Sequence, residues 1–329
     1  MTKYDVVGIG NAIVDVLAKT EDVFLIDNGL TKGTMSIIDS AEAAKLYSLV
    51  QPSAEISGGS AANTRACLAS LGGTGAFCGK VSNDNPGKIF KEDIQKLGIY
   101  FETLPNIGKP ATARSFIFVT PDAERTMQTY LGACVELGPD DINETTISNS
   151  AVTYLEGYLW DPPQAKEAFI KAAAIAHDAD RKVALSLSDP FCVSRHREEL
   201  LSFITEHVNI LFGNEEEIKT LLSIDNFTEA AVKMEKYVEI AALTRGKFGS
   251  LVVGKDAFHE IEACPVEKVI DTTGAGDAYA AGFLFGYTKG YSMANCAEIG
   301  SAVSAEIITH YGARPKQELS RVINGNKLI

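Results

Sequence analysis

The stretch Asp271-Thr272-Thr273-Gly274-Ala275-Gly276-Asp277 is the most informative part of this chain. It follows residues 266–270, which we interpret as a short strand, and it precedes an apolar run typical of a helix. The glycines therefore fall where a loop enters a helix, and free backbone N–H groups at that point can hold a phosphate. Asp277 falls in the first helical turn, where a carboxylate can take a proton from an attacking hydroxyl. The alternative is a tight glycine turn followed by an acidic residue that merely suits a helix N-terminus.

The composition limits the class of protein. The chain has 329 residues, of which 46% are hydrophobic and 22% charged, so it can form one large α/β domain or two ordinary ones. Lys and Arg number 30 and Asp and Glu 43, a net charge of −13, and without a basic run we expect no nucleic-acid partner. No apolar run reaches the ~18 residues of a membrane span, and residues 4–10 resemble a strand rather than a signal peptide. We therefore expect a cytoplasmic protein with no membrane contact.

The six cysteines are scattered and include no C-x-x-C pair. The five histidines show no ligand-like spacing to these cysteines. This pattern argues against a zinc site and suits a reducing compartment.

Polar residues follow the first predicted strand, residues 6–9. Asn11 comes directly after it and Asp15 a few residues later. Ligands in open α/β sheets bind at the carboxyl ends of strands, so both residues are candidates to bind a polar ligand. A turn asparagine and a capping aspartate remain the structural alternative.

A second glycine-rich entry to a helix occupies residues 56–69. Gly58 and Gly59 leave the backbone open to close approach by a ligand, and Asn63 would face back toward them one helical turn later.

Residues 113–120 alternate like a half-exposed strand, and after a turn at 121–124 residues 125–130 form its partner. With a strand at 34–38, this hairpin predicts a small sheet apart from the main one, of the kind that acts as a lid. A helix is expected to open at residues 40–43, with Ser40 as its N-cap.

From residue 151 the pattern alternates between strands and helices, which predicts a mainly parallel sheet covered on both faces. The predicted strands are 152–157, 183–187, 209–213 and 240–244, and the predicted helices are 163–179, 195–206, 215–222 and 228–236. Three late strands lead into polar loops, which can open on one edge of the sheet. Such loops can supply a carboxylate and an amide near hydrated Mg²⁺, a nucleotide turn, and an anion cradle with a base.

Nearly the whole chain resembles the ribokinase-like (PfkB) family of carbohydrate and nucleoside kinases, whose most specific signature matches residues 271–277. The resemblance implies an α/β fold, a ribokinase-like three-layer αβα sandwich with a mainly parallel central sheet and a small β lid. It also implies a single domain over residues 1–329, with the lid formed by about 16–39 and 100–131.

The family motifs imply roles for particular residues. Asp277 matches the catalytic base, and the amides of Gly274, Ala275 and Gly276 match the anion hole. Asn214 and Glu217 match the N-x-x-E motif, which organises Mg²⁺ and phosphate largely through water. Thr244, Gly246 and Gly249 match the nucleotide-binding turn. Asp271 matches a position that helps bind a monovalent cation such as K⁺ in several members.

Within the family, the chain is most similar to the adenosine kinases, in which the residues matching Asn11 and Asp15 meet the ribose hydroxyls. Arg125 matches a lid arginine that neutralises the transferring phosphate, although it also suits a solvent-facing hairpin. Asp189 departs from the apolar residue expected there. An apolar slot for a purine, or alternatively ordinary core, is expected from Met35, Phe116, Phe118 and Tyr158.

The function implied is ATP- and Mg²⁺-dependent phosphorylation of the 5′-hydroxyl of adenosine, giving AMP. The alternative within enzymes is a sugar kinase for fructose, ribose or 2-keto-3-deoxygluconate. A non-catalytic nucleoside or sugar sensor is disfavoured by the intact signature, because a sensor needs no base. Lid strands pair between subunits in some family members, so a monomer and a homodimer both remain open.

Overall fold

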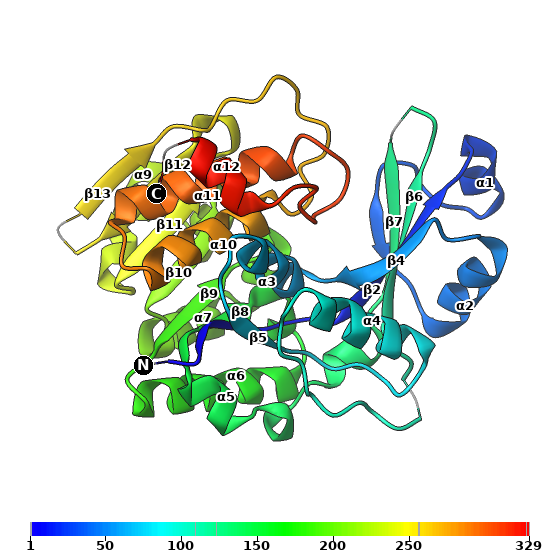
Figure 1. Cartoon of the computed structure of the whole chain (residues 1–329), viewed down its shortest axis with the longest axis horizontal. Helices are drawn as coiled ribbons and strands as arrows, with labels where there is room; N and C mark the ends of the chain where they lie inside the picture. The colour runs from blue at the N-terminus through cyan, green and yellow to red at the C-terminus, as the bar shows by residue number, and fades with distance from the viewer. Residues whose placement is uncertain (1, 109, 123, 256, 327, 329) are drawn as a thin grey trace.

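The computed structural model describes residues 2–108, 110–122, 124–255, 257–326 and 328 (Figure 1). Residue 109, within the predicted lid, and residue 123, within its hairpin turn, lie outside these ranges. In the described part of the chain, one eight-stranded sheet and one five-stranded sheet organise the molecule.

The larger sheet is parallel except at one edge. From that edge its strands are β13 (Ala257–Ile261), β12 (Ser250–Gly254), β11 (Ile240–Thr244), β10 (Ile210–Asn214), β9 (Lys182–Ser186), β8 (Ser150–Glu156), β1 (Tyr4–Ile9) and β5 (Gly75–Cys78). Only the pairs that involve β12 and β13 are antiparallel in this sheet as described. The mainly parallel central sheet predicted from the alternating pattern is therefore confirmed.

Helices cover both faces of this sheet (Figure 1). One core includes α3 (Ser60–Ser70), α10 (Ala275–Thr288), α11 (Met293–Ile307) and α12 (Leu319–Gly325). The other includes α5 (Glu144–Ser148), α6 (Pro163–Asp178), α7 (Pro190–His207), α8 (Glu215–Leu222) and α9 (Phe227–Lys233). Strand side chains alternate between the two cores, as in β10, where Phe212 packs in the first and Leu211 in the second. The three-layer αβα sandwich is thus confirmed.

The smaller sheet stands to one side of this body (Figure 1, right). Its strands, in order, are β3 (Met35–Ile37), β7 (Arg125–Tyr130), β6 (Ala113–Val119), β2 (Ile13–Lys19) and β4 (Ala54–Gly58). The helices α1 (Asp22–Asp27) and α2 (Ser40–Leu49) adjoin it, and α4 (Asn85–Lys96) lies nearer the body. We call this sheet with α1 and α2 the lid.

The lid strands differ in extent from the prediction of about 16–39 and 100–131. The sheet begins at Ile13 and also takes in β4, which lies outside both predicted ranges. Tyr100 and Asn106, by contrast, form bridges with Ala76 and Ser82 at the β5 edge of the main body. Residues 100–106 therefore belong beside the larger sheet.

The two faces of the lid sheet have different neighbours. Phe116 and Phe118 are fully buried, and their rings lie 6.4 Å from Tyr47 of α2 and 5.3 Å from Phe24 of α1, respectively. Because side chains alternate along a strand, Ile117 faces the opposite side, toward a cavity described below. Of the two alternatives given for Phe116 and Phe118, ordinary core is therefore correct and the purine slot is wrong.

Two local predictions were also wrong. Residues 266–270 were predicted as a strand but form none. This segment runs from the β13 edge to α10 without a neighbouring strand, and Ile270 N–H donates to Ile308 O. The N-cap of α2 is Asp39 rather than Ser40. Asp39 Oδ1 accepts hydrogen bonds from the backbone N–H groups of Ala41 and Glu42 at 2.9 and 2.8 Å.

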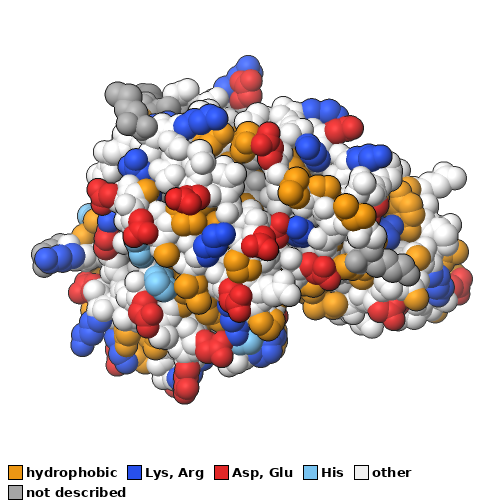
Figure 2. Space-filling model, turned by 90° about the horizontal axis from the view of Figure 1, so that it is seen from below, with side chains coloured by type: hydrophobic (Ala, Val, Ile, Leu, Met, Phe, Trp, Pro, Cys, Tyr) orange, Lys and Arg blue, Asp and Glu red, His pale blue; other side chains and the backbone are white. Residues whose placement is uncertain are grey.

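Acidic and basic side chains are interspersed on the face of the molecule shown in Figure 2. That face presents no extended basic stripe of the kind that tracks a phosphate backbone. None of the helices within the described ranges combines the length and apolar character needed to cross a bilayer.

The two faces of the lid sheet predict unequal effects of two substitutions within it. Phe118→Leu removes ring contacts with Phe24 and should lower the free energy of unfolding by about 1–2 kcal/mol. Ile37→Ala, in the same sheet at a position that is 66% exposed, should stay within about 0.5 kcal/mol of wild type. Chemical denaturation of both variants without ligand provides the test. Equal losses of stability would contradict the assignment of the Phe118 face as the lid core.

Candidate active site

A cavity of about 830 Å³ lies between the body and the lid, and both contribute to its walls. Most of the predicted site residues line it. These are Asn11, Asp15, Gly59, Asn63, Arg125, Asn214, Glu217, Thr244, Gly246, Gly274, Ala275, Gly276 and Asp277. Of the apolar residues expected to hold a purine, Met35 and Tyr158 line the cavity. Three predicted site residues do not line the cavity but contact residues that shape its walls, namely Gly58, Gly249 and Asp271.

Asp277 lies where the N-termini of α3 and α10 meet. Gly274, the N-cap of α10, has a φ of 78° and places the following amides at the cavity wall. Ser60 Oγ donates to Asp277 Oδ1 at 2.5 Å, and Asn63 Nδ2 donates to Oδ2 at 3.4 Å. Burial raises the pKa of Asp277 to about 6, although these two hydrogen bonds oppose the shift. A carboxylate with this pKa is largely ionised at neutral pH and can accept a proton.

The loop after β1 packs tightly on the start of α3. Gly59, the N-cap of α3, has a φ of 100°, and a Cβ there would lie 2.1 Å from Asn11 O. A Cβ at Gly58 would lie 2.4 Å from Asp15 Oδ2, so this glycine makes room for the carboxylate. Gly58 therefore supports Asp15 instead of facing the cavity. Burial raises the pKa of Asp15 to about 6, and the charges of Arg314 and Arg125 oppose that shift.

Arg125, at the start of β7, links the lid to the loop before α10. Its Nη1 donates to Asp271 Oδ2 and to Thr273 Oγ1, the latter at 3.0 Å. Asp271 also accepts hydrogen bonds from the backbone N–H groups of Thr273 (3.0 Å) and Gly312 (2.9 Å). Since a guanidinium already neutralises this carboxylate, the residues as placed do not fit a K⁺ ion bound to Asp271.

Asn214 and Glu217 form a reciprocal cap at the start of α8. Glu217 N–H donates to Asn214 Oδ1 at 3.0 Å, while the two Glu217 oxygens accept from Asn214 N–H (2.9 Å) and Nδ2 (2.6 Å). Burial raises the pKa of Glu217 to about 7, so a nearby cation would stabilise its charged form. Each oxygen keeps lone-pair capacity for a water molecule, which fits the expected water-mediated Mg²⁺ contact.

The turn after β11 divides its predicted residues between two roles. Thr244 and Gly246 line the cavity. Gly249 has a φ of 79°, and a Cβ there would lie 1.9 Å from Ile261 O, so it shapes the entry into β12.

Comparisons with known proteins identify the family. A model of the pfkB family of carbohydrate kinases matches residues 39–319. The chain belongs to this family. The solved structure of adenosine kinase from Sinorhizobium meliloti is 48% identical, with a TM-score of 0.89 over 98% of this chain and 99% of that one. A probable sugar kinase from Rhizobium etli is 45% identical, with a TM-score of 0.91 over the whole of both chains.

A curated nucleoside kinase from Methanocaldococcus jannaschii is 31% identical over 260 residues, which cover 78% of this chain and 80% of that protein. Membership of the family makes the chain an ATP-dependent phosphotransferase that acts on a small nucleoside or sugar.

Sequence reasoning missed one buried acid in this pfkB-family kinase. Glu156, at the end of β8, is 1% exposed and lines the cavity. Its Oε1 accepts from Asn11 Nδ2 at 2.6 Å, and its Oε2 accepts from Ala61 N–H at 2.8 Å. Asn11 Oδ1, which has no hydrogen-bond partner among the described residues, is thereby left as a free acceptor. A Glu closing an otherwise buried strand was the available signal.

Arg314 was also missed. It lines the cavity and donates to the Ala62 carbonyl at 3.3 Å and to Ser57 Oγ at 3.0 Å. It therefore ties the C-terminal part of the chain to the start of α3. Its position directly after Gly312-Ala313 was the signal in the sequence.

Burial raises the pKa of Glu156 from 4.5 to about 7, although hydrogen bonds from Ala61 and Asn11 oppose the shift. The folded protein therefore retains this proton between those pH values while the unfolded chain releases it. The resulting contribution to the free energy of unfolding is fully present below pH 4.5. It is lost, by up to about 3 kcal/mol, as the pH rises through about 7.

Glu156→Gln lacks this pH-dependent loss. Its deficit in unfolding free energy relative to wild type should shrink as the pH rises from 5 to 8, in denaturation experiments without ligand. Glu198→Gln, at a side chain that is 93% exposed, should show no such trend. A deficit in the Glu156 variant that is independent of pH would contradict proton retention at Glu156.

Proposed function

We propose that this kinase transfers the γ-phosphoryl group of ATP to the 5′-hydroxyl of adenosine, giving AMP and ADP. The observation that carries the proposal is that one cavity combines a group of apolar side chains with a group of buried polar ones. The inner face of the lid sheet presents apolar side chains that line the cavity, namely Leu17, Met35, Ile37, Ile117 and Met127. Met35 and Ile37 are 58% and 66% exposed, so they offer apolar surface for a ligand to cover. A purine ring suits this wall better than a small sugar, which carries hydroxyls around its ring.

The polar wall suits a ribose. Asn11 Oδ1 and Asn63 Oδ1 are buried cavity-lining acceptors without hydrogen-bond partners among the described residues. Asp15 adds a carboxylate. It lies two residues before Leu17 on β2, and both side chains line the cavity. Hydroxyl groups can donate to all three, and an unfilled buried acceptor is costly. A nucleoside has both parts in one molecule, one polar and one apolar.

The names of relatives include both a nucleoside kinase and a sugar kinase. The Sinorhizobium meliloti structure is titled an adenosine kinase, whereas the Rhizobium etli structure is titled a probable sugar kinase at nearly equal identity. The apolar lid wall is therefore the main argument for a nucleoside. Formation of AMP from adenosine would return a free nucleoside to the nucleotide pool, a purine-salvage role.

In the proposed reaction, the 5′-oxygen forms a bond to the γ-phosphorus while the bond from that phosphorus to the β–γ bridging oxygen breaks. Asp277 accepts the hydroxyl proton, held in place by Ser60 and Asn63. The Ala275 N–H already donates to Thr272 O at 3.1 Å. In the proposed reaction the amides of Gly274 and Gly276 therefore donate to the transferring phosphoryl group, and Arg125 adds positive charge from the lid. Mg²⁺, held through water by Glu217, would neutralise phosphate charge when bound.

Replacing Asp277 by Asn keeps its size but removes the base. We expect turnover to fall by about 10²–10⁴-fold while ATP binding is largely retained. In the wild type, kcat should decline below pH 6, because protonated Asp277 cannot accept the hydroxyl proton. Steady-state rates across pH 5–8 test both points. Turnover like that of wild type in the variant would remove Asp277 from the mechanism.

The acceptor is tested with adenosine, inosine, ribose, fructose and 2-keto-3-deoxygluconate, each with Mg²⁺-ATP. We expect adenosine to have the highest kcat/KM. A preference for any of the sugars would refute the nucleoside assignment, and no transfer to any acceptor would support a binding protein.

Asp15→Ala should raise the KM for adenosine and spare that for ATP. The increase should be smaller for a deoxyadenosine that lacks the hydroxyl held by Asp15, because that contact is already missing. Equal increases for both acceptors would instead indicate a structural role for Asp15.

A further inference from the structure

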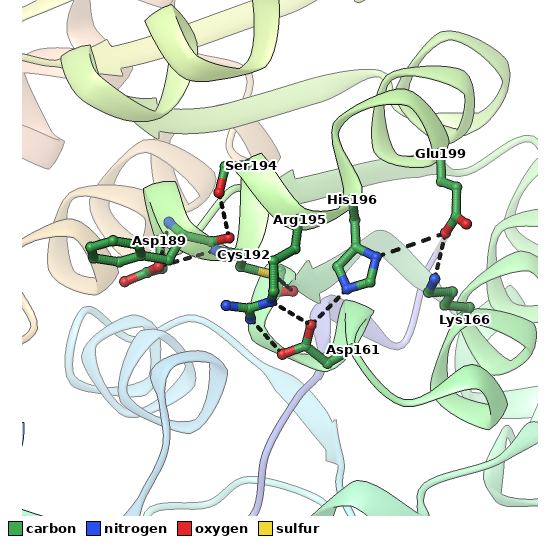
Figure 3. Close-up of polar contacts among 10 residues, drawn as sticks. Asp161, Lys166, Asp189, Cys192, Ser194, Arg195, His196 and Glu199 are labelled. Carbon is green, nitrogen blue, oxygen red and sulfur yellow. Dashed lines mark hydrogen bonds and ion pairs between the residues drawn. The ribbon is translucent and has the colours of Figure 1, made fainter. Parts of the chain in front are cut away.

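An arginine outside the family motifs lies at the wall of the cavity. Arg195 of α7 and Asp161, which follows the 3₁₀ turn Gly157–Trp160, both line it. Arg195 Nη2 donates to Asp161 Oδ2 at 2.7 Å, and Nε donates to Oδ1 at 3.3 Å (Figure 3). Asp161 therefore holds one edge of the guanidinium.

A bend in α7 makes this contact part of a wider network. His196 has non-helical angles, φ −124° and ψ 20°, and its Nε2 lies 2.7 Å from Asp161 Oδ1 (Figure 3). Consecutive residues of a regular helix point about 100° apart, so the bend helps both side chains reach one carboxylate. Burial alone would raise the pKa of Asp161, but the hydrogen bonds from Arg195 and His196 lower it below its usual value. Asp161 is thus a charged anchor.

The other edge of the guanidinium remains available. Arg195 has five N–H donors, of which Nε and one on Nη2 face Asp161. Its Nη1 has no hydrogen-bond partner among the described residues and points away from Asp161 in Figure 3. The side chain is 53% exposed. A planar edge of this kind fits two oxygens of a phosphate group.

Sheet order places this edge on the nucleotide side of the cavity. The strands β8, β9 and β10 are neighbours, and their carboxyl ends lead to Asp161, to Arg195 and to the Asn214–Glu217 cap, respectively. Between β9 and α7, Ser188 has a φ of 66°, and Asp189 caps α7 by accepting from Phe191 N–H at 2.7 Å. This cap is the structural reason for the departure at Asp189 noted in the sequence.

The cavity lining carries both acidic and basic side chains. It includes the carboxylates of Asp15, Glu156, Glu217 and Asp277, which would repel a triphosphate, and the cations that oppose them are Arg125, Arg195, Arg314 and Lys316. Arg125 contacts Asp271 and Thr273 through Nη1, and Arg314 donates to Ser57 and Ala62. Arg195 adds a donor edge to these lining cations, on the side of the cavity formed by the ends of β8, β9 and β10.

We propose that Arg195 binds phosphate oxygens of ATP and that Asp161 is its positioning residue. The inference rests on the proposed function only for ATP as the donor, so it holds whichever acceptor is used. One edge of the guanidinium stays on Asp161 while the other meets the phosphates.

The test is calorimetric titration of Mg²⁺-ATP into the protein without any acceptor. Arg195→Ala should raise the Kd about tenfold, as expected for loss of a charge-assisted contact. The matched control is Arg197→Ala, which removes the same charge from the same helix at a residue that bonds Ser223 and does not line the cavity. It should leave the Kd within about twofold of wild type. Equal effects of the two substitutions would overturn the proposal.

Asp161→Asn separates positioning from folding. In the wild-type background this change should weaken ATP binding, because Arg195 is held less firmly. In the Arg195→Ala background it should have no further effect, so the two changes are non-additive. Additive effects would show that Asp161 acts independently of Arg195 and would overturn its positioning role. Adenosine binding measured in parallel should be unchanged in all three variants, which keeps failure here distinct from failure of the acceptor assignment.

Discussion

The hydrogen bond between Ser60 and Asp277 joins two helix N-termini that are 217 residues apart in the sequence. One glycine-rich loop leads into α3 and the other into α10, and the two helices pack against each other on the same face of the larger sheet. The base and the anion cradle depend on this meeting point. Backbone donors, the Asp277 carboxylate and the side-chain amide of Asn63 come together there. Neither loop alone would supply a base beside an anion cradle.

The motif residues could be placed from the sequence because each depends on local geometry. A glycine before an apolar helix fixes where amides converge, which is why Gly274 and Gly59 were found without a structure. The carboxyl ends of parallel strands gather at one edge, which brought Asn11, Asn214 and Thr244 together. The alternation of β6 and β7 was equally local, and the hairpin was found where predicted.

The wrong predictions concern features that depend on contacts between parts of the chain that are distant in sequence. Alternation shows that Phe116 and Ile117 face opposite ways, but it cannot show which face α1 and α2 will cover. Residues 266–270 have the pattern of a strand, yet a strand also needs a partner, and none lies beside that path among the described residues. Glu156 gave little local signal. Its role depends on Asn11 and Ala61, which lie 145 and 95 residues away.

The carboxylates of this cavity also connect stability with binding. Burial raises the pKa values of Asp15, Glu156, Glu217 and Asp277 to between about 6 and about 7. At neutral pH the folded protein therefore carries charged groups in surroundings that disfavour charge, which lowers its stability relative to a neutral site. Ligand hydroxyls that donate to these oxygens, and cations that accompany a nucleotide, would relieve this cost. This cost is removed only when a ligand fills the cavity. The same carboxylates therefore lower the stability of the unliganded protein and raise its affinity for the ligand.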